Sequence, residues 1–407
     1  MPADAATRRF PARPCPVCGC TRSTLLFQQS FEQLSGVHLL DGYLIVICEA
    51  CGAGFADDIP PQPVFDQYYR DFSKYDNAGD STDEAPRDTS RFLEIADTII
   101  PFIPASDTLI LEIGCGSGQL LRVLRDRGYD KVLGVDPSPA CVRTAQLRQG
   151  VPAIAATIVT VPPPEQLYGF LILIGVMEHI RDLDAAVEQL GLLLDPRGRI
   201  FLEVPDASRY LPGVDAPFQE FSVEHINFFS RCSLTNLMQR RGFRAIAGGH
   251  CVRAQNEVTC PTAFAVFEKS SQPLPIEPDT ETAAGLRNYI RAGQAEDRRI
   301  RAMIAQAVPS NGQMIVWGVG THTLRLLASG GLDPARISLF VDSSPNYQGQ
   351  ELRGVPVVPP EALQHRPEPI LISSRGFQRA IHNQIRHTLQ LPNPVIQLYD
   401  EAIVRRP

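Results

Sequence analysis

The sequence predicts an α/β protein: a doubly wound, Rossmann-like sheet with a small cysteine-rich domain before it and a second Rossmann-like α/β domain after it. Three observations support this fold class. Residues 108–120, TLILEIGCGSGQL, pass from an apolar strand through alternating glycines into a helix. A second strand–glycine–helix unit follows at residues 314–328. Strand-like and helix-like segments alternate along much of the remaining chain, which favours parallel sheets.

Composition and charge describe an ordinary globular protein. The 407 residues, 44% of them hydrophobic and 20% charged, suffice for two or three packed domains. A net charge of −7, with no basic run, argues against nucleic acid or an anionic membrane as the main partner. The longest apolar run, residues 170–177, is far shorter than the ~20 residues that span a bilayer. The first residues lack a secretory signal. We therefore expect a cytoplasmic protein with no membrane partner.

Changes in composition divide the chain into three expected domains. Residues 270–281, SSQPLPIEPDTE, are rich in proline and mark the clearest boundary. A polar, acidic stretch at 77–89, NAGDSTDEAPRDT, marks another. The expected division is 1–75 for a zinc-binding domain with an aromatic segment, 76–270 for the central sheet domain and 271–407 for the C-terminal α/β domain.

Five of the ten cysteines lie within the first 51 residues. Cys15-Pro-Val-Cys18 and Cys48-Glu-Ala-Cys51 are two C-x-x-C pairs, each with a glycine close by. In an intracellular chain such cysteines favour metal binding or burial over disulfides. Four thiolates in two such pairs are what a closed tetrahedral zinc site requires. The sequence therefore predicts a structural Zn²⁺ site without a catalytic role, with Cys20 as a spare that could replace Cys18.

The glycine-rich stretch predicts a ligand-binding turn. Gly114, Gly116 and Gly118 follow the apolar strand directly, and a backbone without Cβ atoms can approach a ligand closely. The spacing Gly-x-Gly-x-Gly differs from the Gly-x-Gly-x-x-Gly of a dinucleotide pyrophosphate site. A second strand, residues 131–135, ends in Asp136, whose carboxylate can accept both hydroxyls of a ribose.

A later strand is expected to bring further residues to the same place. Residues 170–174 form an apolar strand that ends at Gly175-Val-Met-Glu-His179. In an open parallel sheet the ligand lies beyond the carboxyl ends of the strands. Glu112, Asp136 and residues 176–179 are therefore expected around one crevice.

The segments 112–118 and 134–136, together with Val-Met-Glu-His at 176–179, resemble class I S-adenosylmethionine (SAM) methyltransferases. The alternative is another doubly wound nucleotide binder. The chain departs from the family pattern in having Gly169 where an aspartate often opens the strand, and in lacking an acid at 155–157. The resemblance implies SAM as cofactor and assigns its binding to Glu112, Gly114, Gly116, Gly118, Asp136, Val176 and Met177.

Two stretches outside the glycine turn carry candidate catalytic groups. Residues 218–242 contain adjacent Glu224 and His225, a plausible acid/base pair; the alternative is a capping or packing role before the helix at 233–241. Residues 65–77 group several aromatic side chains, which either pack on the next domain or form a lid whose Tyr75 faces the substrate. His225 is suited to proton transfer near neutral pH because the ordinary pKa of histidine is about 6.5.

Taken over nearly the whole chain, these features resemble the nucleotide-sugar C-methyltransferases. The resemblance implies His225 as general base, Glu224 as its neighbour and Tyr75 as a substrate contact. If a proton is removed from a carbon beside a ketone, an enolate forms, and Tyr75, His179 or a group of the C-terminal domain would face its oxygen. Ser222 stands where the family often has a tyrosine three residues before the histidine.

The C-terminal domain repeats the strand–glycine–helix–strand–Asp pattern. Gly318 and Gly320 follow one strand, and the strand at 337–341 ends in Asp342. The third glycine of a dinucleotide site is missing, and Thr-His-Thr follows where the family often has a lysine. We expect this domain either to hold the nucleotide half of a sugar substrate or to cover the active site.

The predicted function is SAM-dependent methylation of a carbon on a nucleotide-linked keto-deoxysugar, a small-molecule substrate. One alternative is O-methylation of a sugar hydroxyl or other small molecule, where the same histidine would deprotonate an alcohol. Another is a non-catalytic binder of SAM and nucleotide-sugar, against which the intact glycines and Asp136 argue.

Overall fold

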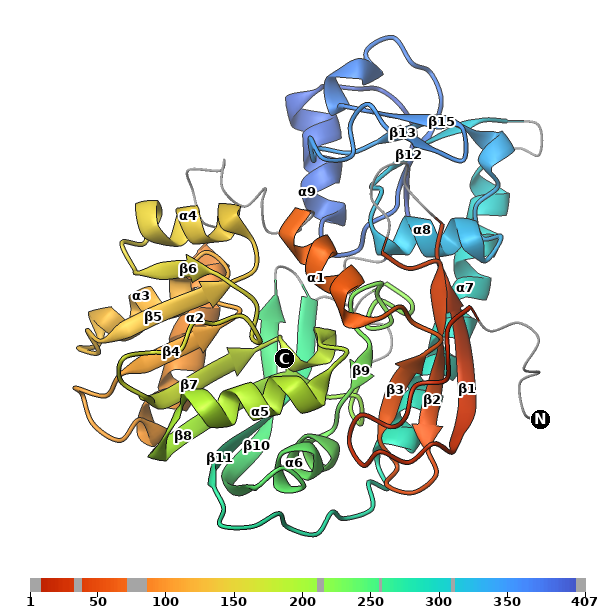
Figure 1. Cartoon of the computed structure of the whole chain (residues 1–407). Helices are drawn as coiled ribbons and strands as arrows, with labels where there is room; N and C mark the ends of the chain where they lie inside the picture. The colour runs from red at the N-terminus through yellow and green to blue at the C-terminus, as the bar shows by residue number, and fades with distance from the viewer. Residues whose placement is uncertain are drawn as a thin grey trace.

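The computed structural model describes residues 9–32, 39–71, 86–210, 216–255, 258–308 and 312–399. Figure 1 shows three groups of strands in these ranges: an N-terminal group in red, a central group in yellow to green, and a C-terminal group in blue. The chain thus has the α/β architecture that its sequence predicts. The division at residues 75 and 270 stays a proposal.

The N-terminal sheet is antiparallel and takes one strand from far along the chain. Its strands are β1 (Ser23–Ser30), β2 (Gly42–Cys48), β3 (Gly54–Asp57) and β9 (Asn227–Phe228), in the order β1-β2-β3-β9. Strand β2 ends at Cys48, the first cysteine of the second C-x-x-C pair. Because Phe55 pairs with Asn227, the segment that carries His225 is anchored on this sheet. Helix α1 (Gln62–Asp71) follows β3.

The central sheet contains the predicted glycine strand near its middle. Its order is β10-β11-β8-β7-β4-β5-β6. The strands are β4 (Ile110–Ile113), β5 (Val132–Asp136), β6 (Ala153–Ala155), β7 (Tyr168–Ile174), β8 (Leu194–Pro205), β10 (Phe243–Gln255) and β11 (Val258–Lys269). Strands β4 to β8 are parallel, as expected. The chain order reverses between β4 and β7, which makes the crevice beyond these two strands the preferred ligand site.

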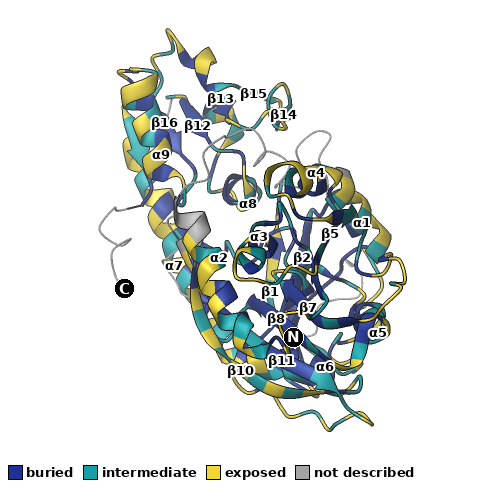
Figure 2. Cartoon of the chain, turned by 90° about the vertical axis from the view of Figure 1, so that its left-hand side faces the viewer, coloured by how far each residue is buried: buried dark blue, intermediate teal, exposed yellow. Residues whose placement is uncertain are grey.

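Helices cover both faces of this sheet. They are α2 (Pro86–Ile99), α3 (Gln119–Asp126), α4 (Pro139–Arg148), α5 (Leu183–Leu193) and α6 (Arg231–Gln239). Alternate residues of β4 face opposite layers: Ile110 packs in the cluster containing α2 and α3, whereas Leu111 packs in the cluster containing α5 and α6. Figure 2 shows the resulting buried strands in dark blue between partly exposed helices.

Two long strands were not expected from the sequence. Strands β10 and β11 form an antiparallel pair, and β11 pairs antiparallel with β8. Adjacent Gly248 and Gly249, together with Pro261 inside β11, interrupt the side-chain alternation by which a strand is recognised.

The C-terminal domain begins with the long helix α7 (Thr282–Ala307) and has a second sheet in the order β14-β15-β13-β12-β16-β17. Strands β15, β13, β12, β16 and β17 run parallel. The elements after α7 are β12 (Met314–Trp317), α8 (Thr321–Ala328), β13 (Ile337–Val341), β14 (Glu351–Leu352), β15 (Val355–Val358), β16 (Ile370–Ile372), α9 (Gln378–Asn383) and β17 (Val395–Gln397). The strand expected before Gly318 and the strand expected at 337–341 are therefore confirmed as β12 and β13.

A buried aspartate, Asp279, joins the cysteine-rich loop to two helices through its backbone N–H and its carboxylate. Asp279 is 5% exposed, and its backbone N–H donates to the carbonyl of Cys51 at 2.8 Å. Its Oδ2 accepts from the hydroxyls of Ser230, which caps α6, at 2.5 Å and of Thr282, the first residue of α7, at 2.7 Å. The start of α7 is thus fixed to the N-terminal sheet and to the central domain at once.

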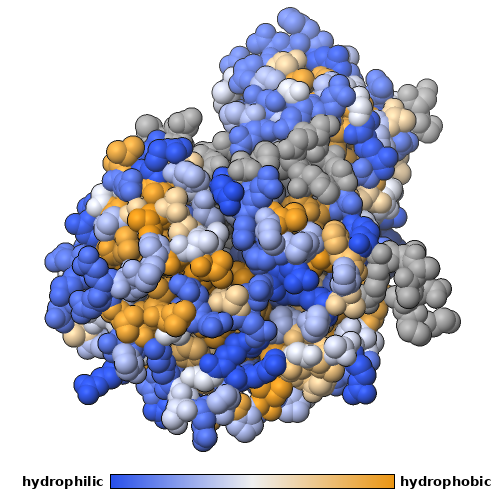
Figure 3. Space-filling model, in the orientation of Figure 1, coloured by the Kyte–Doolittle hydropathy of each residue, from blue (hydrophilic) through white to orange (hydrophobic). Residues whose placement is uncertain are grey.

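The described helices include none with the length and apolar character needed to cross a membrane. On the face shown in Figure 3, hydrophobic residues gather over the central domain, and the C-terminal domain at the top is mostly hydrophilic.

Candidate active site

The glycine turn lies at the reversal point of the central sheet. Gly114 has a φ of +77°, a left-handed conformation that L side chains rarely adopt. A Cβ atom on Gly114 would lie 2.4 Å from Cγ2 of Val176, at the end of β7. A Cβ on Gly116 (φ +50°) would meet no atom within 4 Å. Gly114 therefore lets two strand ends approach each other, whereas Gly116 borders open space; Gly118 caps α3.

Asp136 holds this turn from the neighbouring strand. Its Oδ2 accepts from the backbone N–H of Gly116 and its Oδ1 from that of Ser138, both at 2.9 Å. Glu112 is 5% exposed, and its Oε2 makes no hydrogen bond among the described residues. Burial, and secondarily the charge of Asp136, raises the pKa of Glu112 well above its usual range. An orphaned buried carboxyl oxygen beside an open glycine turn fits a site completed by a polar ligand.

Of the two residues assigned to the cofactor after β7, Val176 lies against the glycine turn. Met177 is 1% exposed, and its side chain belongs to the hydrophobic core. The Met177 carbonyl accepts from the side-chain amide of Asn227 at 2.9 Å. Met177 therefore connects the end of β7 to the segment carrying His225.

His179 and His225 lie side by side, with ring centroids 5.0 Å apart. Polar side-chain atoms of both histidines and of Glu178 lie within 4.8 Å of one another. His179 comes from the short helix η4 (Met177–His179), and His225 from the loop before β9. His179 Nδ1 lies 3.0 Å from the carbonyl oxygen of Glu224.

The aromatic residues of α1 join this pair. The Tyr69 hydroxyl lies 2.9 Å from His179 Nδ1, and the Tyr68 hydroxyl donates to Glu224 Oε1 at 3.2 Å. Both rings belong to the aromatic segment noted in the sequence, but the family resemblance implied Tyr75 as the substrate contact. Tyr75 lies outside the described residues, so its role stays a prediction.

A second carboxylate near the His225 ring, besides that of Glu178, is that of Glu220, which no sequence pattern indicates. His225 Nδ1 lies 3.2 Å from the backbone oxygen of Glu220 and 3.9 Å from its Oε2. The thiol of Cys260, on β11, donates to Glu220 Oε1 at 3.6 Å. Burial and the charge of Glu220 raise the pKa of Cys260, which keeps it a neutral donor. A glutamate five residues before a histidine has no pattern of its own, and the contact appears only when the loop is folded.

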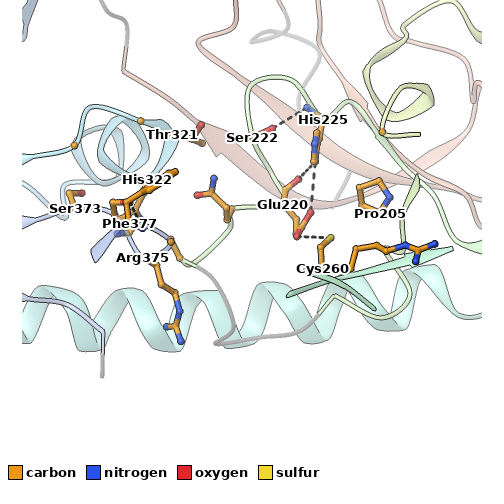
Figure 4. A pocket seen from close by; sticks show the side chains of 18 of the residues that line it. Pro205, Glu220, Ser222, His225, Cys260, Thr321, His322, Ser373, Arg375 and Phe377 are labelled. Atoms are coloured by element: carbon orange, nitrogen blue, oxygen red, sulfur yellow. Dashed lines mark hydrogen bonds and ion pairs between the residues drawn. The ribbon is translucent and has the colours of Figure 1, made fainter. Parts of the chain in front are cut away.

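A cavity of about 690 Å³ extends from these histidines to the C-terminal domain. At one end it is lined by Gly175, Glu178, His179, Glu220 and His225. At the other it is lined by Gly318, Gly320, Asp342, Ser373 and Phe377. Figure 4 shows the two ends facing one another, with His225, Glu220 and Cys260 on one side and Thr321, Ser373 and Phe377 on the other. The cavity lining includes Gly175, and the next residue, Val176, lies against the glycine turn.

The far end repeats the hydrogen bonds of the first glycine turn. Asp342 Oδ2 accepts from the N–H of Val319 and its Oδ1 from that of Ser344, both at 2.9 Å, and burial raises the pKa of Asp342. Gly318 has a φ of +106° and a backbone close to Ser373 across the reversal point between β12 and β16. This end therefore has the same strand–turn–carboxylate arrangement as the first glycine turn, at a reversal point of its own sheet.

His322, near the start of α8, has a buried side chain with a structural role. His322 is buried, and its Nε2 lies 2.9 Å from the Tyr399 hydroxyl. Burial and the adjacent Arg325 lower the pKa of His322 well below its usual value. It is therefore held neutral beside the cavity.

Four cysteines converge in the N-terminal domain. The Sγ atoms of Cys15, Cys18, Cys48 and Cys51 all lie within 4.8 Å of one another. The pairs Cys15–Cys51 and Cys18–Cys48 are 3.6 and 3.4 Å apart, close to the ~3.8 Å that tetrahedral Zn–S bonds of 2.3 Å would give. The Cys20 thiol turns away to the Arg22 carbonyl, so Cys20 does not replace Cys18 in this cluster. The donor set fits Zn²⁺.

Comparison with known proteins matches residues 87–247 to a family model described as a methyltransferase domain. The chain is 26% identical over 159 residues to the tRNA U34 carboxymethyltransferase of Cellvibrio japonicus, covering 37% of this chain and 49% of that protein. It is 28% identical over 115 residues to the ubiquinone biosynthesis O-methyltransferase of Xylella fastidiosa, covering 26% and 45%. It thus spans about half the length of these curated relatives. Because some of these are tRNA enzymes, the absence of a nucleic-acid partner stays a prediction.

Among solved structures, magnesium protoporphyrin IX methyltransferase from Synechocystis PCC 6803 with bound SAH aligns with a TM-score of 0.40 and 14% identity, over 51% of this chain and 99% of that one. The family match over residues 87–247, with the strand order and the glycine turn, shows that the central part of this chain contains a methyltransferase domain with the class I SAM methyltransferase fold.

Proposed function

We propose that this chain methylates a carbon next to the ketone of a nucleotide-linked sugar, with SAM as methyl donor and His225 as general base. The observation that carries the proposal is the single cavity. It has a proton-transfer pair at one end and a nucleotide-type turn at the other. A substrate with a reactive sugar joined to a nucleotide has the same two-ended form.

The cofactor site proposed for SAM is the glycine crevice. Gly116 gives the backbone room to approach the ligand, Asp136 is placed for the ribose hydroxyls, and Glu112 offers a buried oxygen. SAM, when bound, supplies an electrophilic methyl group on sulfur. The crevice and the cavity meet at Gly175 and Val176, so a sugar held in the cavity would present its carbon toward the crevice.

The residues of the cavity can prepare the nucleophile. The His225 imidazole would accept the proton from the carbon beside the ketone, and the electron pair would delocalise onto the carbonyl oxygen as an enolate. Hydrogen-bond donors near that oxygen stabilise the charge as it develops. His179, whose Nδ1 lies close to the Tyr69 hydroxyl and the Glu224 carbonyl, lines this end of the cavity and would donate from an Nε2 that carries a hydrogen.

The four cysteines are proposed to hold a structural Zn²⁺. The cluster is closed, since four thiolates fill a tetrahedral shell and leave no position for substrate. Its role is to fix the N-terminal sheet, which in turn anchors β9 and the His225 loop.

O-methylation is the second candidate. It is favoured by the 28% identity to an O-methyltransferase of ubiquinone biosynthesis. In that case His225 would take the proton from a hydroxyl, and no carbon-bound proton would exchange. The localisation in the cytoplasm stays a prediction.

Hydrogen exchange at the substrate carbon tests the proposal. The wild-type enzyme, incubated in heavy water with nucleoside-diphosphate keto-deoxysugars and no SAM, should exchange the proton beside the ketone for deuterium, as followed by NMR. The substitution His225→Ala should abolish the exchange and lower kcat by ~10²–10⁴-fold. SAM affinity, measured by calorimetry, should be unchanged because the imidazole serves only the acceptor.

The exposed His387 provides a matched control, and His387→Ala should behave as wild type. Methylation without exchange would favour the O-directed reaction. Full activity of His225→Ala would show that the base lies elsewhere.

A further inference from the structure

We propose that Glu220 is the positioning residue of His225: it fixes the ring with Nδ1 protonated, so that Nε2 is the atom that takes the substrate proton, and its carboxylate stabilises the imidazolium that results. The inference rests on the proposed role of His225 as base. It adds a residue that neither the motifs nor the family match assigns.

The tautomer follows from the hydrogen bond at Nδ1. The backbone oxygen of Glu220 lies 3.2 Å from this nitrogen and can only accept, so Nδ1 must carry the hydrogen. In the neutral ring the lone pair is then on Nε2. The carboxylate of the same residue lies 3.9 Å from Nδ1. One residue therefore supplies both a neutral acceptor and a negative charge to the same edge of the imidazole.

Glu220 is itself held from two other elements. Its backbone N–H donates to the hydroxyl of Tyr289, on α7, at 3.1 Å. Its Oε1 accepts from the Cys260 thiol, on β11. Figure 4 shows Glu220 between His225 and Cys260 at this end of the cavity. Because the side chains of His225 and Glu220 are only 17% and 18% exposed, their charges interact through a less polar medium than water.

The substrate carbon, His225 and Glu220 each have a distinct role in the proton transfer. The C–H bond beside the ketone breaks, an N–H bond forms at His225 Nε2, and the electron pair stays with the substrate as the enolate. The His225 ring then carries a positive charge. A protonated His179 would repel it, because the two ring centroids are 5.0 Å apart. An anionic Glu220 offsets this charge, as a carboxylate does for any histidine base that it orients.

Glu224 is adjacent to His225 in the sequence but has a different task. Its carboxylate accepts from Tyr68, and its carbonyl orients His179. The titratable groups around the His225 ring therefore include His179 and Glu178 from η4, Glu220 from its own loop and Cys260 from β11.

The test compares Glu220→Gln and Glu220→Asp with the control Glu268→Gln, on the same strand as Cys260 but outside the lining of the cavity. We expect Glu220→Gln to lower kcat by about tenfold to a hundredfold, below the ~10²–10⁴-fold attributed to the base itself, with little change in KM. The acidic limb of the kcat/KM profile should move to lower pH by about one unit, because an anion near the ring raises the pKa of the base. Glu220→Asp should regain part of kcat.

A second measurement needs no substrate. Nitrogen NMR of histidine-labelled full-length protein, with His225 assigned by loss of its signals in His225→Gln, should show Nδ1–H in wild type and a lower His225 pKa in Glu220→Gln. A wild-type ring without Nδ1–H, or an unchanged pKa and pH profile in Glu220→Gln, would overturn the inference even if His225 is the base. Full activity of His225→Ala, with the NMR shifts present, would instead remove the proposed function and leave the pairing intact.

Discussion

Alanine at Gly114 should mainly reduce stability and alanine at Gly116 should mainly reduce SAM affinity, although the two glycines are only two residues apart. A Cβ at position 114 would lie 2.4 Å from Val176 Cγ2, at least ~1.1 Å inside the 3.5–4.0 Å at which carbon atoms pack. The left-handed backbone adds about 1–2 kcal/mol of strain, and overpacking about 1–3 kcal/mol. Gly114→Ala should therefore reduce the stability of the domain by about 2–5 kcal/mol.

Position 116 has the backbone strain without the clash. Gly116→Ala should cost only about 1–2 kcal/mol of stability, since its methyl group meets no atom within 4 Å. That methyl group would occupy the space proposed for SAM. We therefore expect SAM affinity to fall by about tenfold or more, equivalent to ~1.4 kcal/mol, in a protein whose melting temperature is close to that of wild type.

The assay combines thermal melting with calorimetric titration of SAM, and a second substitution isolates the clash. Val176→Ala removes Cγ2, so the double variant with Gly114→Ala should be more stable than the sum of the two single changes predicts, with a coupling of about 0.5–3 kcal/mol. Additive effects, or wild-type SAM binding by Gly116→Ala, would show that the turn does not approach β7 and the cofactor in this way.

Three further predictions concern the metal, the ribose and pH. Cys48→Ser should remove stoichiometric zinc in elemental analysis and lower the melting temperature, whereas Cys20→Ser should do neither, because metal binding contributes to folding; wild type purified without zinc would contradict the assignment. Asp136→Ala should weaken SAM binding by about tenfold or more, since each hydrogen bond to the charged acceptor is worth about 1.5–3 kcal/mol and the carboxylate also holds Gly116; equal affinity would place the ribose elsewhere. Burial raises the pKa of Glu112, so the SAM-free protein should lose stability as pH rises above the ordinary carboxyl range toward that raised pKa, and Glu112→Gln should flatten this dependence; equal slopes for the two proteins in thermal melts would argue against it.

Local chemistry explains which features the sequence predicted. The glycine turn and Asp136 lie within 25 residues of each other, and strand, turn and acid occur in the order that the fold requires. The same holds for Gly318 and Asp342. Paired cysteines likewise identify their own cluster. In each case the interacting groups are fixed by one or two short connections.

The remaining features depend on contacts that no local pattern encodes. Strands β10 and β11 are stabilised by their pairing with β8, although glycines and a proline weaken their own signal. Glu220 reaches His225 because the loop before β9 turns back on itself, while the adjacent Glu224 is taken by Tyr68. A sequence shows which acid is adjacent to a histidine along the chain, and the fold decides which one lies beside its ring.

Asp279 connects the cysteine cluster to helix α7, and through it to the C-terminal domain. Through Asp279, the loop of Cys51 shares hydrogen bonds with the first turn of α7, the helix that leads to the C-terminal domain and supplies Tyr289 to Glu220. Oxidation of these cysteines, or loss of the Zn²⁺ proposed there, would therefore weaken the hydrogen bonds that hold α7 in place. The two ends of the cavity would then be less well aligned. The enzyme would then lose catalytic alignment before it lost its methyl donor, and an oxidised preparation would bind SAM yet turn over slowly.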